Sequence, residues 1–150
     1  MVNNYQRTHT RTLAVQMLEL RAKWHNIIEK ISLDKGLLTV VLNIRPTESS
    51  CIYKILLECK ENGYPSVWLL NPAVRKFKGK LPHHIYSVSK RHSQYINLCV
   101  CNFRRCEWTR SDSLAKYIPF ISTWLWAYEN WQITGIWHYD ESFPVAKKKK

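Results

Sequence analysis

The chain has 150 residues, 45% of them hydrophobic and 13% aromatic, which suits one folded domain and excludes a disordered segment. Its 23 basic and 11 acidic residues give a net charge of +12, or +8 without the four lysines at 147–150, and such an excess favours an acidic partner. The four glycines form neither a GxGxxG nor a GxxxxGKS/T pattern, so the sequence indicates no common nucleotide-binding loop.

Residues 1–12 are polar and lack the apolar core of a signal peptide, and no apolar run approaches the length of a membrane span. We therefore expect a cytoplasmic protein whose five cysteines are thiols. We also expect a single domain over residues 1–150, with a folded core at 10–140 and a flexible basic tail at 141–150.

Apolar residues recur every three or four positions from Leu13 to Ile31, which predicts an amphipathic first helix that ends before residues 34–36. Runs of β-branched and apolar residues then predict strands at 37–44, 51–59 and 66–70, and a short fourth strand at 84–87. Because the connections between these runs are short, an antiparallel four-stranded meander is the expected topology.

Residues 87–110 show no sustained period and are rich in polar residues and cysteine, which is typical of an irregular functional segment. Ser111 or Asp112 is then expected to cap a second long helix, which carries an apolar stripe from Leu114 and ends near Gly135. The sequence thus predicts an α+β fold with a helix, a meander, an irregular segment that carries cysteines, and a long helix.

Cys101 is the candidate catalytic residue, because it lies on the irregular segment ahead of the second helix. A cysteine is nucleophilic as the thiolate, and nearby cations lower its pKa by favouring that form. Arg104 and Arg105 are the candidate cations. The alternative from the residues alone is a buried, inert cysteine, which is the usual state of this residue type.

The spacing of Cys99, Cys101 and Cys106 also raises the questions of a metal site and of a disulfide. The segment lacks the C-x2-C pairs of common zinc sites, even with His83 or His84 as a further ligand, so we expect no metal and no cofactor. A disulfide between two of the three thiols is the stronger alternative, because Cys99 and Cys101 project the same way along an extended chain.

Several short motifs follow one another in a distinctive order. They are His84-Ile85-Tyr86-Ser87, Val100-Cys101, Glu107-Trp108, the segment 124–131 and Thr134-Gly135-Ile136-Trp137. Over about residues 81–137, this order resembles the ubiquitin-conjugating-enzyme-like (UBC-fold) proteins of bacterial CBASS antiphage operons, which accompany cyclic-oligonucleotide synthases (CD-NTases). Upstream of residue 81 the resemblance is one of element order alone.

The resemblance implies an enzyme of the conjugating type. In such an enzyme, the Cys101 thiol forms a thioester with the C-terminal glycine of the partner CD-NTase and then transfers the CD-NTase to an amine. This conjugation would regulate antiviral signalling. Cys101 is favoured over Cys99, because the spacing from Cys101 to Glu107-Trp108 matches the spacing between the catalytic cysteine and the Glu-Trp pair in that family. The acyl group must be activated by another protein or arrive by exchange, and the sequence names no acceptor lysine.

This chain departs from the eukaryotic conjugating enzymes in two places. Their His-Pro-Asn motif, whose asparagine supports the oxyanion, is replaced by Pro82-His83-His84, so His84 and Asn102 become the candidates for that support. About fifteen residues remain after the second helix, so the paired C-terminal helices are missing.

Two other functions compete with the enzyme. A UBC fold without catalysis would be a binding module that scaffolds the synthase. A basic nucleic-acid-binding protein is the weaker hypothesis, because no predicted helix carries a basic stripe with spaced aromatic residues. The catalytic hypothesis requires an exposed, nucleophilic Cys101 sulfur, whereas a sulfur enclosed in apolar packing favours the binding module.

Overall fold

The structure, a computed structural model, describes residues 10–87, 90–105 and 107–138. Its elements in chain order are helix α2 (Leu13–Trp24), strands β1 (Ile28–Asp34), β2 (Leu37–Ile44), β3 (Tyr53–Lys60), β4 (Ser66–Asn71) and β5 (Ile96–Leu98), the 3-10 turns η1 (Phe103–Arg105) and η2 (Leu114–Lys116), and helix α3 (Ile118–Thr134). The predicted α+β fold is confirmed. The predicted tail at 141–150 lies outside the described residues, and the single domain stays a prediction.

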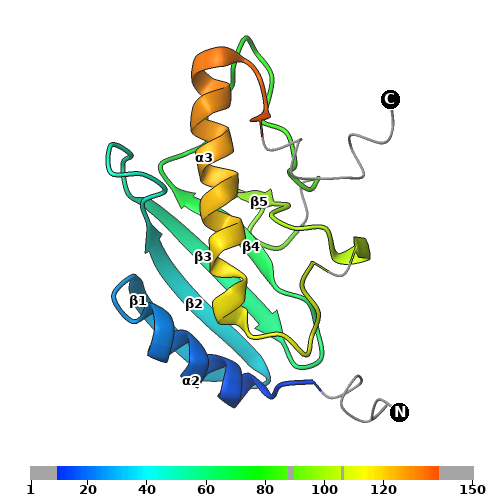
Figure 1. Cartoon of the computed structure of the whole chain (residues 1–150). Coiled ribbons are helices and arrows are strands. Elements are labelled where there is room, and N and C mark those ends of the chain that lie inside the picture. The colour runs from blue at the N-terminus through cyan, green and yellow to red at the C-terminus, as the bar shows by residue number, and fades with distance from the viewer. Residues whose placement is uncertain (1–9, 88–89, 106, 139–150) are drawn as a thin grey trace, which may run out of the picture.

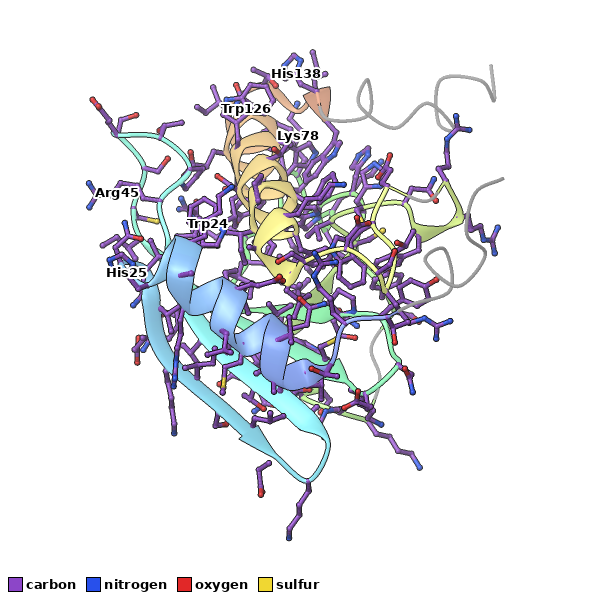
Figure 2. All side chains as sticks on the ribbon, turned by 60° about the horizontal axis from the view of Figure 1, so that its bottom comes forward. Trp24, His25, Arg45, Lys78, Trp126 and His138 are labelled. Atoms are coloured by element: carbon purple, nitrogen blue, oxygen red, sulfur yellow. The ribbon has the colours of Figure 1, made fainter. Side chains whose placement is uncertain are left out.

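One antiparallel sheet in the strand order β1-β2-β3-β4-β5 forms the framework. Figure 1 shows α3 lying across one face of this sheet, with α2 beside β1. Alternate residues of β2, from Leu38 to Ile44, are buried beneath the helices, as a strand with one covered face requires. Trp24, at the C-terminal end of α2 (Figure 2), donates its indole N–H to the Ala115 carbonyl (2.8 Å) and ties α2 to η2.

The first helix is shorter than predicted, because the residues from Ile28 onward form β1. A β-bulge lies between Ile28 and Lys30, where the register shifts, so that Ile28 pairs with Leu42 and Ile31 with Val40. The extra residue places two isoleucines three positions apart on the same face of a strand. That spacing is also the spacing of a helix, which explains the wrong prediction.

The predicted fourth strand at 84–87 is wrong as well. Ile85 makes an isolated antiparallel bridge to Leu98, and the strand itself is β5, inside the segment predicted to be irregular. The expectation that Ser111 or Asp112 caps the second helix is wrong: Ser113 caps the turn η2, and the N-cap of α3 is Tyr117, which makes no side-chain cap bond. Helix α3 follows with Pro119 in its first turn, where a missing N–H costs nothing. Between the end of α3 and residue 138, where the description ends, there is no further α-helix.

Gly135 ends α3, as predicted, in the left-handed region at φ 78°, and its N–H donates to the Trp131 carbonyl (2.8 Å). A Cβ at this position would lie 2.8 Å from Cε2 of Phe77. We expect Gly135→Ala to lower the free energy of unfolding by about 2 kcal/mol in urea titrations, since a left-handed alanine costs about 1–2 kcal/mol before any clash.

Gly36 supplies the matched control for this substitution. It has a similar φ of 74°, and nothing lies within 4 Å of the position of its Cβ. Gly36→Ala should therefore show the backbone cost without the contact to Phe77. A loss in Gly135→Ala no larger than in Gly36→Ala would show that Phe77 does not restrict this position.

Candidate active site

A short backbone ladder joins the two segments that carry the predicted site residues. The chain leaves β5 at Cys99, whose N–H donates to the His84 carbonyl (2.9 Å), and the Tyr86 N–H donates to the Asn97 carbonyl (2.9 Å). The indole N–H of Trp124, from α3, donates to the same His84 carbonyl (2.9 Å). The His84 backbone therefore fixes the end of β5 against α3.

Hydrogen bonds also hold several of the described residues that follow Cys101. The Glu107 carboxylate accepts the Asn102 N–H (2.7 Å), and the Asn102 side-chain oxygen accepts the Arg104 N–H (3.0 Å) at the start of η1. At the far end, the indole N–H of Trp108 donates to the Ser113 carbonyl (2.9 Å). Asn102 and Trp108 are thus each fixed by a hydrogen bond.

Cys101 is part of the hydrophobic core and only 1% exposed. Burial raises the pKa of its thiol to about 12, the Glu107 carboxylate adds to the rise, and a hydrogen bond with the Tyr117 hydroxyl opposes it. Arg104 and Arg105 are both exposed. The predicted lowering of the thiol pKa by these two arginines is therefore wrong for this structure.

Cys99 lies nearer the surface and has a tyrosine partner of its own. Burial raises the pKa of the Cys99 thiol, while a hydrogen bond with the exposed Tyr86 lowers it. A tyrosine hydroxyl thus opposes the rise of each thiol pKa, Tyr86 for Cys99 and Tyr117 for Cys101.

The thiols of Cys51, Cys59, Cys99 and Cys101 are all free in the structure, so the disulfide considered between Cys99 and Cys101 is not formed. Cys106, the third thiol of that prediction, lies outside the described residues. Among the residues that the structure does describe, no three His, Cys, Asp or Glu side chains gather as a metal site would require.

The two predicted oxyanion donors have structural contacts. The His84 ring packs against the Trp137 ring, with centroids 5.8 Å apart, and the neighbouring His83 ring stacks on the same indole at 5.6 Å. The side-chain oxygen of Asn102 caps η1, as described above. Catalytic roles for His84 and Asn102 stay predictions.

Tyr117 and Glu107 are the site residues that sequence reasoning did not assign. Tyr117 belongs to the apolar stripe of the second helix and Glu107 to the Glu-Trp motif, and neither stands within four residues of Cys101. A hydroxyl within an otherwise apolar stripe was the signal available for Tyr117.

A cavity of about 320 Å³ opens beside the ladder of His84 and β5. Its lining is mostly apolar and includes Trp68, Leu81, Ile85, Tyr86, Tyr95 and Ile96. Leu81 and Tyr86 are exposed at this place. The chain therefore has an apolar cavity that Tyr86 helps to line.

The match to a known family agrees with this arrangement. A model of the type II CBASS E2 protein family matches residues 16–144. The chain belongs to this family. The resemblance stated from the sequence motifs is therefore confirmed, and this CBASS E2 protein belongs to an antiviral defence system as a conjugating-enzyme-like component. No curated protein matches the chain.

The described part of this CBASS E2 protein contains no helix that is both long and apolar enough to cross a bilayer. The cytoplasmic location stays a prediction.

Proposed function

We propose that this CBASS E2 protein carries the C-terminal glycine of its partner CD-NTase as a thioester on Cys101 and transfers it to an amine, which regulates antiviral signalling. The observation that carries the proposal is the match to the type II CBASS E2 family over residues 16–144, a range that includes Cys101. The ladder that holds Cys99 against His84 supports it, because the ladder fixes the chain just before Cys101.

The chemistry is acyl exchange in two steps. The Cys101 thiolate attacks the carbonyl carbon of the glycine, which another protein supplies as an adenylate or a thioester, and AMP or a thiolate leaves. An amine then attacks the Cys101 thioester, the C–S bond breaks, and the sulfur leaves as a thiolate while the amine nitrogen loses a proton. The products are an amide and the free enzyme.

The burial of Cys101 adds a requirement to this proposal. Cys101 is only 1% exposed, so a carbonyl carbon can reach its sulfur only after the side chains that cover it move when the acyl donor binds. The apolar cavity beside Tyr86 is a site where the tail of the synthase can lie against the ladder.

The test uses intact mass spectrometry with the synthase bearing a mercaptoethanesulfonate thioester on its C-terminal glycine. We expect an adduct that hydroxylamine removes, that is absent in Cys101→Ala and that persists in Cys99→Ala. An adduct that persists in Cys101→Ala and disappears in Cys99→Ala would assign the chemistry to the other thiol. Absence of any adduct with the folded protein would reject the transfer.

The second candidate function is a binding module that holds the synthase without catalysis. One observation favours it, namely the enclosed Cys101 thiol whose pKa is raised rather than lowered. The two functions separate in Cys101→Ser, which should abolish the thioester and signalling in an enzyme but leave a scaffold fully active.

A further inference from the structure

Residues 75–80, which follow β4, form a small basic hairpin. The Phe77 N–H donates to the Lys80 carbonyl (2.9 Å), and the Lys80 N–H donates to the Phe77 carbonyl (3.1 Å). Four of the six residues are exposed cations, namely Arg75, Lys76, Lys78 and Lys80. None of these four side chains forms an ion pair with a residue that the structure describes. The basic hairpin therefore presents a positive surface that the described chain does not neutralise.

The basic hairpin is fixed to the C-terminal end of α3. The Tyr128 hydroxyl accepts the Arg75 N–H (2.8 Å), and the Gln132 side chain donates to the Arg75 carbonyl (2.8 Å). The Phe77 ring packs on Trp131, with ring centroids 5.7 Å apart. These contacts hold the backbone that carries the cations, which lowers the entropy that is lost when a partner binds.

Two exposed isoleucines lie at the same end of α3, where Figure 2 also shows Lys78. Ile133 is 81% exposed and Ile136 is 58% exposed. Ile133 and Arg75 line one cavity of about 480 Å³, which opens between α3 and the loop before β3. The Glu129 carboxylate in this cavity already accepts hydrogen bonds from two hydroxyls. Exposed apolar side chains with a charged rim are typical of a surface that binds another molecule.

The composition of this surface favours a protein partner over a nucleic acid. Single-stranded nucleic acids bind where bases stack on exposed aromatic rings, but Phe77, the aromatic residue of the basic hairpin, is half-buried against Trp131. Isoleucine side chains match apolar side chains of a protein, and cations without ionic partners match carboxylates. The complement is therefore an acidic protein surface that also carries apolar residues.

The chain leads from the basic hairpin directly to the candidate active site. Leu81, the next residue, is exposed and lines the apolar cavity beside Tyr86. Three residues further on, the His84 carbonyl accepts the Cys99 N–H in the ladder described above. An acyl donor whose tail lies in that cavity is thus within reach of the basic hairpin.

We propose that the basic hairpin and Ile133 dock an acidic, partly apolar surface on the folded body of the synthase while the tail of the synthase occupies the active site. This inference rests on the proposed function and adds a recognition surface outside the tail. Docking through charge accelerates the encounter with the synthase, and it raises the effective concentration of the tail near Cys101. A donor that consists of the tail alone gains nothing from this surface.

The experiment reverses three charges of the basic hairpin at once, in the variant Lys76→Glu, Lys78→Glu, Lys80→Glu. The matched control reverses three other exposed lysines, in the variant Lys23→Glu, Lys30→Glu, Lys35→Glu. Figure 1 shows α2 and β1, which carry or adjoin the control lysines, away from the C-terminal end of α3. Both variants change the net charge equally, and Lys78 and Lys35 have similar φ angles of 52° and 51°.

Each protein is offered two acyl donors as mercaptoethanesulfonate thioesters, which exchange onto a thiol without ATP. One donor is the whole synthase, and the other is a short peptide with the C-terminal residues of the synthase. Mass spectrometry measures the rate at which the Cys101 thioester forms. Titration calorimetry with a synthase that lacks its terminal glycine measures binding without chemistry.

At about 50 mM salt, we expect the hairpin variant to react with the synthase about ten- to a hundred-fold more slowly and to bind it more weakly by a similar factor. Its rate with the short peptide should stay within about two-fold of that of the unaltered protein, and the control variant should stay within about three-fold with both donors. The difference should shrink at about 0.5 M salt, because ions screen exposed charges. Ile133→Ala should weaken binding about three- to ten-fold at both salt concentrations, since its contact is apolar.

Equal losses in the hairpin variant and in the control variant would overturn the docking surface, because net charge alone would then explain them. An unchanged affinity of the hairpin variant for the glycine-deleted synthase would overturn it as well. If the synthase does not bind but a DNA oligonucleotide does, and the hairpin variant loses that binding, the partner is a nucleic acid and the proposal is wrong. If neither donor forms a thioester on Cys101 of the unaltered protein, the proposed function fails, while the calorimetry still decides the docking surface.

Discussion

Iodoacetamide is expected to alkylate Cys101 of the folded protein about a hundred- to a thousand-fold more slowly than Cys101 of the urea-unfolded chain at pH 8. The reason is the pKa of its thiol, which burial raises from 9.0 to about 12, since the thiolate is the reactive form. The rate in the folded protein should keep rising as the pH increases beyond 9. Peptide mass spectrometry after timed quenching measures the rate at each cysteine.

Cys51 is the internal control for reagent and protein quality, because its side chain is exposed. It should react within minutes under the same conditions, whereas Cys59, whose pKa burial raises to about 11, should react slowly. Alkylation of Cys101 at the rate of the unfolded chain would contradict the enclosed thiol. The proposed function adds an expectation: the synthase should accelerate labelling of Cys101, because its tail must uncover the Cys101 side chain.

The same pKa difference affects stability at alkaline pH. Because the Cys101 thiol binds its proton more tightly in the folded chain than in the unfolded chain, its contribution is complete below about pH 9. That contribution is lost as the pH rises towards 12. Cys101→Ala should remove this part of the alkaline transition.

Sequence periodicity predicted the fold where one physical constraint dominates the choice of residues. Strand β2 alternates buried and half-buried residues, because only one of its faces meets the helices, and its predicted bounds at 37–44 are confirmed. The two wrong predictions have different causes. The bulge in β1 gives a strand the spacing of a helix, and β5 is a strand of three residues, too short to show a period.

For the candidate site, the sequence motifs located the right segment but not its environment. Spacing along the chain placed Arg104 and Arg105 near Cys101, yet η1 leaves both arginines exposed. Tyr117, sixteen positions away, opposes the rise of the Cys101 thiol pKa, and its ring packs on Phe103 and Trp108. Such pairings depend on three-dimensional packing, which a single sequence does not encode in any local pattern.

The segment before β5 is secured on the outer face of the sheet by a clamp of Glu58, Arg91 and His92. Arg91 donates from Nε and Nη2 to the two oxygens of Glu58, each at 2.7 Å, and His92 Nε2 lies 3.1 Å from the same carboxylate. The His92 ring also packs edge-on against Trp68 at 4.7 Å. Because β5 begins at Ile96, this clamp helps to position the ladder that precedes Cys101.

Arg91→Ala is expected to lower the free energy of unfolding by about 2–3 kcal/mol at pH 7, because it leaves a buried carboxylate without its main donors. The Glu58 side chain is 8% exposed while Arg91 covers it. Burial raises the pKa of Glu58, but the bonds from Arg91 and His92 outweigh burial and hold this pKa below its ordinary value. Chemical denaturation at several pH values measures the loss.

The sign of the pH dependence distinguishes this clamp from simple loss of packing. A carboxyl with a lowered pKa stabilises the fold above its ordinary pKa of 4.5, and the contribution disappears as the pH falls through the pKa of the folded state. The difference between Arg91→Ala and the unaltered protein should therefore shrink towards pH 3.

Glu58→Gln is the matched variant: it should cost about 1 kcal/mol alone and restore part of the stability of Arg91→Ala, since it removes the unpaired charge. If the double variant loses the sum of both single losses, the bond between Arg91 and Glu58 does not hold this segment.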